Sequence, residues 1–237
     1  MESYSIILAA ESDMMQVHDM AEVVFRHTYK DILSPEQMDY MMDWMYSPEN
    51  LKKQIEDGHV YFVAYRDDTP CAYVSVQPDG TGEDGRMLFH LHKIYVMPSE
   101  QGRGLGKKMF AHALSYVAAV ADGHPASVEL NVNRNNPAVG FYRHLGLKIL
   151  RQGDFHIGNG FYMNDYIMGI DLNDICSLFL FLEPSAFAES FGYYPQELAV
   201  GGAEFVFRPL LNGLHRLCVN AQYEAFVLLL WHRGLVC

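Results

Sequence analysis

The chain is short of positive charge. Its 237 residues include 17 lysines and arginines against 29 aspartates and glutamates, which gives a formal net charge of −12. Non-specific binding to nucleic acid depends on basic side chains that neutralise phosphates. The charge balance therefore argues against a nucleic-acid partner, and it is compatible with weak steering of a cationic amine toward the protein.

Cysteine is scarce and long apolar runs are missing. Four cysteines, Cys71, Cys176, Cys218 and Cys237, have neither metal-ligand spacing nor the density of a disulfide framework, and the eleven histidines are scattered. No run approaches the roughly 18 apolar residues that cross a bilayer. The first residues also lack the basic and apolar regions of a signal peptide. We therefore expect a cytoplasmic protein without a metal and without a membrane partner.

The pattern of apolar residues predicts a mixed α/β domain. Half of the residues are apolar and 19% are charged, which is typical of a globular chain. Apolar residues that recur every two positions indicate a strand, and those that recur about every 3.6 positions indicate a helix. We expect strands over 4–9, 59–65, 71–77, 86–97, 127–133, 148–155 and 161–171, and helices over 12–29, from Ser34, over 47–57 and over 105–120.

A glycine-rich loop joins a predicted strand to a predicted helix. It reads Gln101-Gly102-Arg103-Gly104-Leu105-Gly106, and Lys107 and Lys108 follow it. Glycines let the backbone approach a ligand closely, and the free N–H groups of a helix N-terminus bind phosphates. The spacing fits neither a Rossmann fingerprint nor a Walker loop. Taken alone, the motif is also compatible with a tight turn beside a solvated basic face.

Two motifs together resemble the GNAT superfamily of N-acetyltransferases. The loop after Ile94-Tyr95-Val96 is similar to motif A of that family. About thirty residues later, Asn135, Ala138, Tyr142 and Gly146-Leu147 have the spacing of motif B. The resemblance covers residues 1–172. It implies a mixed, mostly antiparallel central sheet of about seven strands flanked by helices, with an unassigned C-terminal extension.

The resemblance also implies acetyl-CoA as cosubstrate. In the family, loop amides bind the pyrophosphate, and the backbone of the strand before the loop pairs with the pantetheine arm. Carried over to this chain, the cofactor-binding residues are Ile94, Tyr95, Val96, Gln101, Gly102, Arg103, Gly104, Leu105, Gly106, Lys107, Asn135 and Tyr142.

The candidate catalytic residues are a tyrosine and two histidines. Tyr142 matches the family's tyrosine that meets the leaving thiolate, and a phenol is a suitable acid for this step. His90 and His92 lie two apart on one strand, so they share a face. They resemble the paired histidines of arylalkylamine N-acetyltransferases, and imidazole titrates near neutral pH. Glu83, Asp84 or a water chain are alternative bases. Tyr142, His90 and His92 could alternatively serve only in packing.

The acceptor is expected to be a primary amine. The run from Thr28 to Leu51 resembles small bacterial acetyltransferases of the polyamine or small-amine type. Aromatic rings and a carboxylate suit a cation, although many of these side chains would equally fill a core. The substrate-binding candidates are Tyr29, Trp44, Tyr46, Tyr162 and Asp165.

Two further questions stay open at the level of sequence. A non-catalytic acyl-CoA-binding module, or an enzyme acting on protein N-termini or lysines, would share the same loop. Residues 173–237 contain no lysine and match no family that we recognise. We expect them to form an extension of unknown role, for which a subunit contact in a homodimer is one option.

Overall fold

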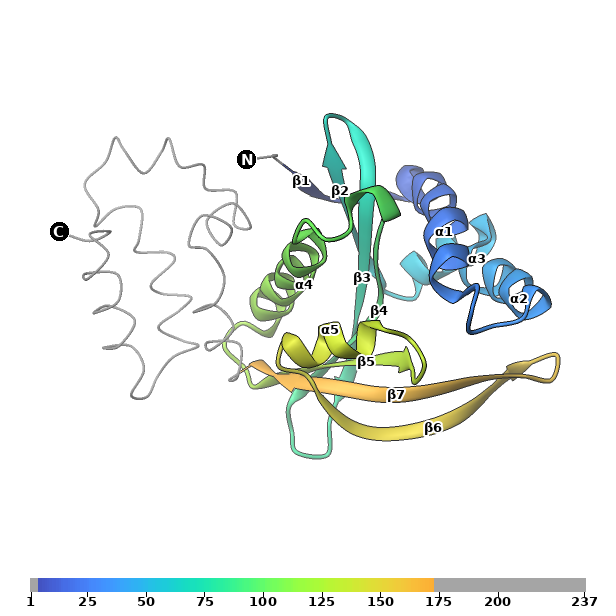
Figure 1. Cartoon of the computed structure of the whole chain (residues 1–237). Coiled ribbons are helices and arrows are strands. Elements are labelled where there is room, and N and C mark those ends of the chain that lie inside the picture. Colours follow the sequence, from blue (N-terminus) through green and yellow to red (C-terminus); the bar gives the residue numbers. More distant parts are fainter. Residues whose placement is uncertain (1–3, 173–237) are drawn as a thin grey trace.

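The computed structural model describes residues 4–172 and contains one sheet of seven strands (Figure 1). The strand order is β1-β2-β3-β4-β5-β7-β6, and only β4 and β5 pair in parallel. The predicted mixed, mostly antiparallel sheet with flanking helices is confirmed. The extension expected over residues 173–237 lies outside the described residues. The strands are β1 Ser5–Leu8, β2 Val60–Arg66, β3 Thr69–Thr81, β4 Met87–Val96, β5 Ala126–Asn133, β6 Lys148–Gly158 and β7 Phe161–Asp171.

Three helices before the first hairpin begin as their sequences predict. They are α1 Met14–Tyr29, α2 Pro35–Tyr46 and α3 Pro48–Glu56. Ser34 caps α2 by accepting from the Gln37 amide (3.2 Å), and Ser47 caps α3 by accepting from the Asn50 amide. Proline follows each serine, where its missing N–H costs nothing. Such a cap stabilises a helix by about 1 kcal/mol.

The hairpins depend on residues that tolerate positive φ. Asp67 and Asp68 form the two-residue turn between β2 and β3, with φ of 48° and 63°. Asn159 and Gly160 form the turn between β6 and β7, with φ of 49° and 76°. Turns of this kind match the twist of the flanking strands. Strand β3 is longer than the strand predicted over 71–77, because it continues through Pro78 to Thr81.

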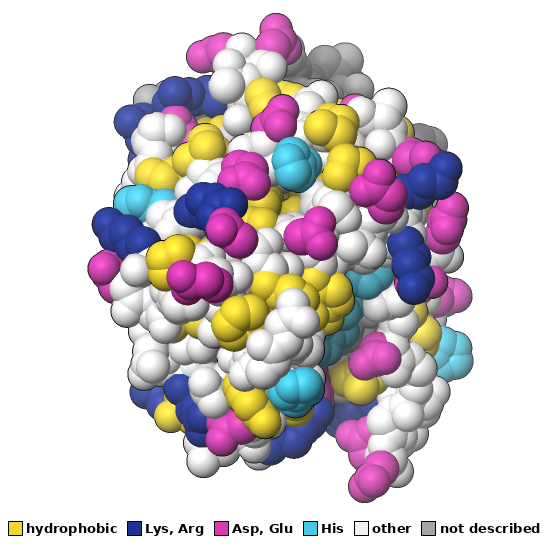
Figure 2. Space-filling view, turned by 90° about the vertical axis from the view of Figure 1, so that its right-hand side faces the viewer, with side chains coloured by type: hydrophobic (Ala, Val, Ile, Leu, Met, Phe, Trp, Pro, Cys, Tyr) yellow, Lys and Arg dark blue, Asp and Glu magenta, His cyan; other side chains and the backbone are white. Residues whose placement is uncertain are grey.

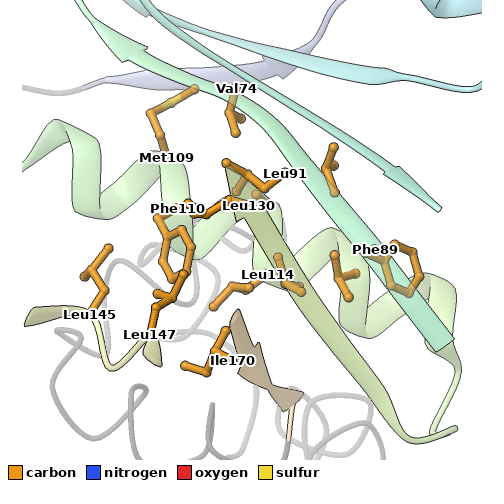
Figure 3. Close-up of a cluster of buried hydrophobic side chains, with 14 of the residues drawn as sticks. Val74, Phe89, Leu91, Met109, Phe110, Leu114, Leu130, Leu145, Leu147 and Ile170 are labelled. Carbon is orange, nitrogen blue, oxygen red and sulfur yellow. The ribbon is translucent and has the colours of Figure 1, made fainter. Parts of the chain in front are cut away.

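Helices cover the sheet on both faces and produce two separate cores (Figure 1). Helix α4 (Leu105–Ala121) and helix α5 (Ala138–His144) contribute to the first core, together with the facing sides of the strands. Figure 3 shows part of this core, in which Met109, Phe110 and Leu114 lie against Val74 and Leu130. Helices α1, α2 and α3 build the second core on the other face. No helix among the described residues is long and apolar enough to span a membrane.

The sheet opens at one place in its centre. Strands β4 and β5 pair only from Met87–His90 against Ala126–Glu129. Beyond that point β4 remains paired with β3 as far as Val96, and β5 remains paired with β7 as far as Asn133. The two halves of the sheet therefore separate between Leu91 and Val96, and the site lies at this gap.

Candidate active site

A cleft of about 730 Å³ occupies the gap between β4 and β5. It is bounded by β4, the glycine loop, the end of β5, helix α5 and the C-terminal end of α1. Apolar and polar side chains both contribute to its wall, as is usual for a small-molecule site. The predicted residues that line it are Tyr29, His92, Ile94, Tyr95, Val96, Gln101, Gly102, Gly104, Leu105, Gly106, Lys107 and Tyr142.

The three glycines of the loop are required for two different reasons. Gly102 and Gly104 have φ of 76° and 81°, a region that side chains with Cβ rarely adopt. Gly104 is the N-cap of the 17-residue helix α4. Gly106 is helical, but a Cβ there would lie 3.4 Å from the Phe141 ring. The N-terminus of α4 therefore opens into the cleft with the small residues and free N–H groups that suit a phosphate.

Side chains next to the loop fix its path. Gln101 donates from Nε2 to the Val96 carbonyl oxygen (3.0 Å), which ties the loop back to β4. Glu100 is buried, and its carboxylate accepts from the Tyr4 hydroxyl (2.9 Å) and pairs with Arg66 (2.8 Å). Glu100 also lines the cleft, although its role was not predicted from the sequence. Arg103 is exposed and does not belong to the lining.

Helix α5 brings Tyr142 to the cleft. Its side chain is 7% exposed, and burial raises the pKa of the phenol above its usual range. Tyr142 therefore carries its proton throughout the neutral range and is available as a donor. Asn135, in contrast, is exposed and outside the lining. The neighbouring Asn136 is buried and lines the cleft, and its Oδ1 accepts from the Ala138 amide (2.9 Å). In the sequence, Asn136 stands directly before Pro137 and the start of α5, and this position could have indicated it as a cleft residue.

A β-bulge in β4 places the histidines. Lys93 is opposite Ser75 and Leu91 is opposite Val76, so His92 is an extra residue on this strand. The rings of His90 and His92 lie 4.4 Å apart between centroids, which confirms that they share a face. His92 lines the cleft, whereas His90 is not among the lining residues.

A third histidine joins this pair and was missed in the sequence. His59 stacks on His92 with 4.1 Å between ring centroids, and its Nδ1 lies 3.2 Å from the Ser75 hydroxyl. Burial lowers the pKa of all three imidazoles, that of His59 to about 4. His92 is open toward the cleft but crowded by the other two rings and by Lys93, whose charges also disfavour its protonation. The cluster is neutral at pH 7, as a proton acceptor requires. Figure 2 shows histidine side chains in the hollow to the right of the centre.

The bulge also turns Lys93 inward. It is 4% exposed, and its Nζ donates to Gln54 Oε1 (2.5 Å), which also accepts from the Tyr61 hydroxyl (2.6 Å). The rings of Tyr46 and Tyr61 each lie 5.5 Å from Nζ. Burial lowers the pKa of the Lys93 amine to about 7.

The predicted acceptor residues are dispersed. Tyr29 lines the cleft, and its hydroxyl lies 3.5 Å from that of Tyr95. Tyr46 is fully buried in the second core, where it accepts from the Tyr73 hydroxyl (3.1 Å). Trp44 and Tyr162 are 44% and 49% exposed and do not line the cleft.

Asp165 lies behind the cleft wall. It is 1% exposed and accepts from Asn131 Nδ2 (3.3 Å), and Asn131 itself lines the cleft. Burial raises the pKa of the Asp165 carboxyl. Of the alternative bases, Glu83 and Asp84 are both exposed and outside the lining. Within the described residues no group of three or more His, Cys, Asp or Glu side chains is arranged to hold a metal ion.

The family follows from a match over most of this domain. Residues 23–147 match the model of the acetyltransferase (GNAT) family, so the chain belongs to this family. The fold is shared with PaiA N-acetyltransferase from Thermoplasma acidophilum in complex with coenzyme A. The two are 21% identical with a TM-score of 0.56, over 70% of this chain and 98% of the other.

Two further solved structures have similar folds. The ribosomal-protein-S18-alanine N-acetyltransferase from Escherichia coli is 16% identical (TM-score 0.52, 71% of this chain and 94% of the other). Mutant forms of the spermidine/spermine N-acetyltransferase from Vibrio cholerae are 19% identical (TM-score 0.52, 73% and 96%). At these identities the likeness extends to the fold alone.

Proposed function

We propose that the protein transfers an acetyl group from acetyl-CoA to a primary amine, by direct attack in a ternary complex. The observation that carries this proposal is the joint opening of the α4 N-terminus, Tyr142 and His92 into one cleft at the β4–β5 gap. We assign the catalytic domain to residues 1–172 and a cytoplasmic setting to the enzyme.

The cleft fits a long pyrophosphate-bearing molecule. The N–H groups of Leu105, Gly106 and Lys107 at the start of α4 would hold the pyrophosphate, with Gln101, Gly102 and Gly104 shaping the loop. The backbone of β4 from Ile94 to Val96 has no strand partner on the β5 side. It would hydrogen-bond amide groups of the pantetheine arm, as a strand edge does with an extended peptide.

Two side chains of the cleft wall would move the protons. The acceptor amine must lose a proton before it can attack, and His92 is a neutral base exposed to the cleft. Tyr142 is a protonated phenol and would donate to the departing sulfur. His90 lies against His92 and would influence it, without itself lining the cleft.

The acceptor would enter beside the end of α1. Tyr29 supplies an aromatic and hydroxyl surface there, and Asn131 links the cleft to the carboxylate of Asp165. Both features suit a small polar amine. Trp44 and Tyr162 would contact only an acceptor that extends outside the cleft, and Tyr46 supports the wall from the core. On the face shown in Figure 2, lysines and arginines are interspersed with acidic side chains and form no single basic patch.

Two measurements test the proposal. Calorimetry with acetyl-CoA should detect binding, and an amine library read by thiol release should identify turnover. Polyamines, arylalkylamines and peptides with a free N-terminus or lysine should be compared, because relatives of this fold act on small amines or on ribosomal protein. Absence of binding at millimolar acetyl-CoA would refute the proposal, and binding without turnover would favour a non-catalytic acyl-CoA module.

A further inference from the structure

His92 can serve as a base through one ring nitrogen only. A neutral imidazole carries one proton, so one nitrogen donates while the other keeps a lone pair. Which nitrogen is bare depends on the hydrogen bond made by the other. In this structure Nε2 of His92 lies 2.9 Å from Gln77 Oε1.

The orientation of Gln77 is determined by a backbone carbonyl. Gln77 Nε2 donates to the Asp57 carbonyl oxygen (2.6 Å), and a carbonyl oxygen can only accept. The amide nitrogen must therefore face Asp57, so Oε1 faces His92. The position of Asp57 is itself secured, because its amide donates to the Lys53 carbonyl at the end of α3 (2.8 Å).

This chain of contacts has one consistent assignment of protons. Because Gln77 Oε1 can only accept, Nε2 of His92 must carry the hydrogen, and Nδ1 keeps its lone pair. The ring is also restrained on its faces, by His59 at 4.1 Å and by His90 at 4.4 Å between centroids. A half-turn of the ring about the Cβ–Cγ bond would put Cε1 in place of Nε2 and break the bond to Gln77.

We propose that Gln77 is a positioning residue that holds His92 as the Nε2–H tautomer, so that Nδ1 accepts the proton of the acceptor amine. The proposal rests on the acetyl transfer proposed above. In this step an N–H bond of the ammonium breaks, its electron pair stays on the amine nitrogen, and a new N–H bond forms at Nδ1. The imidazolium donates to Gln77 through Nε2 and then releases the Nδ1 proton to water.

The other groups around His92 leave this assignment unchanged. The charged or titratable neighbours are His90 and Lys93 on β4 and His59, which directly precedes β2. Asp57 acts on His59, while Asp79, Glu129 and Arg151 act on His90. None of these neighbours makes a hydrogen bond to either nitrogen of His92 in the described structure.

Two substitutions of Gln77 test the assignment: one keeps an acceptor opposite His92 and the other replaces it with a donor. Gln77→Glu offers only acceptors, so His92 should keep its Nε2 proton. The carboxylate stabilises the imidazolium, so the acidic limb of the kcat/KM profile should move to higher pH. Gln77→Lys offers only donors, so the proton should move to Nδ1 and kcat should fall by about 10²-fold, with the KM for acetyl-CoA unchanged. Gln152→Glu and Gln152→Lys, on the exposed strand β6, are the matched controls for added charge.

The decisive measurement is the ring ¹⁵N NMR spectrum of histidine-labelled protein near pH 8. The His92 signals, assigned by their loss in His92→Gln, should show a protonated Nε2 and a bare Nδ1 in the wild type and in Gln77→Glu. They should show the reverse in Gln77→Lys. A wild-type spectrum with the proton on Nδ1, or a Gln77→Lys protein with wild-type spectrum and kcat, overturns the proposal.

The predictions about the tautomer and about the activity are tested separately. The NMR measurement requires neither acetyl-CoA nor turnover, so the tautomer is decided even if no amine is acetylated. Lack of turnover with every amine refutes the acetyl transfer and the use of Nδ1 in it. If the enzyme is active and Gln77→Glu has the same kcat/KM pH profile as the wild type, the use of Nδ1 as base is refuted while the acetyl transfer stands.

Discussion

Replacing Lys93 by methionine should stabilise the protein at pH 7. The fall of the Lys93 pKa from 10.5 to about 7 measures how strongly the folded state disfavours its charge. At 1.36 kcal/mol per pH unit this amounts to about 4 kcal/mol at pH 7. Methionine fills a similar space, and Gln54 Oε1 keeps its bond from Tyr61, so loss of the Lys93 bond costs only about 1 kcal/mol. We therefore expect a net stabilisation of roughly 2–3 kcal/mol.

The same substitution should remove a pH dependence. Unfolded lysine keeps its proton up to its ordinary pKa, whereas folded Lys93 loses it near pH 7. Between these values the unfolded state binds more protons, so wild-type stability rises with pH. The rise from pH 7 to 9 should be about 2 kcal/mol. Above pH 9, Cys71 and the buried tyrosines act in the opposite direction, since burial raises their pKa values.

Urea unfolding at pH 7, 8 and 9 measures both effects. Lys52→Met is the matched control, because the Lys52 side chain is 56% exposed and pairs with Glu11 at the surface (3.1 Å). The wild type and the control should gain stability from pH 7 to 9, and Lys93→Met should not. A wild-type stability that is flat over this range, or a Lys93→Met protein less stable than the wild type at pH 7, would refute the reasoning.

Three further predictions concern the cleft and the histidines. Gly106→Leu should displace Phe141 and abolish the thermal shift caused by acetyl-CoA, while Gly140→Ala, where a Cβ meets no atom within 4 Å, should preserve it. Tyr142→Phe should lower kcat by about 10²-fold with little change in acetyl-CoA affinity, and an unchanged kcat with rate-limiting chemistry would leave Tyr142 a packing role. The folded state lowers the pKa of the three clustered histidines. Their contribution to the free energy of unfolding should therefore be fully present above pH 6.5 and should decline below it. Acid titration of the His59→Gln, His92→Gln double variant should show a shallower decline, and an unchanged slope would contradict the assignment.

Much of the fold was predictable because local signals agreed with one another. Ser-Pro pairs marked the starts of α2 and α3, and alternating apolar residues marked the strands. Asp67 and Asp68 lie between two of the predicted strands and form the turn of the first hairpin. Strand β3 was predicted too short because Pro78 and Gly80 usually end a strand, yet pairing continues past them with an irregular register.

The site was predicted less completely, because its members come from distant parts of the chain. The glycine loop and Tyr142 belong to continuous motifs, and both line the cleft. His59 directly precedes β2 and Gln77 lies in β3, neither within a motif, and only the pairing of β2, β3 and β4 brings them to His92. Tyr46 and Trp44 were grouped by residue type, although helix α2 directs one into the core and the other to solvent.

The bulge did leave a mark in the sequence. Apolar residues of β4 that face α4 occur at Phe89 and Leu91 and then at Ile94 and Val96. A strand without irregularity repeats every second residue, so the three-residue step from Leu91 to Ile94 signals one inserted residue. That step places two polar residues, His92 and Lys93, between Leu91 and Ile94, after which the apolar alternation resumes at Ile94 and Val96.

The position of the bulge places the proposed ligand-binding edge and the proposed base at one point. Pairing of β4 with β5 ends at His90, and the extra residue of β4 follows two positions later. From there to Val96, β4 has an edge without a strand partner on the β5 side, and buried backbone groups require partners. An extended ligand could supply them, while the bulge turns His92 toward the same opening and Lys93 toward the second core. One inserted residue therefore separates His92, the proposed proton acceptor, from the buried amine of Lys93, and it does so where the sheet has an unpaired strand edge.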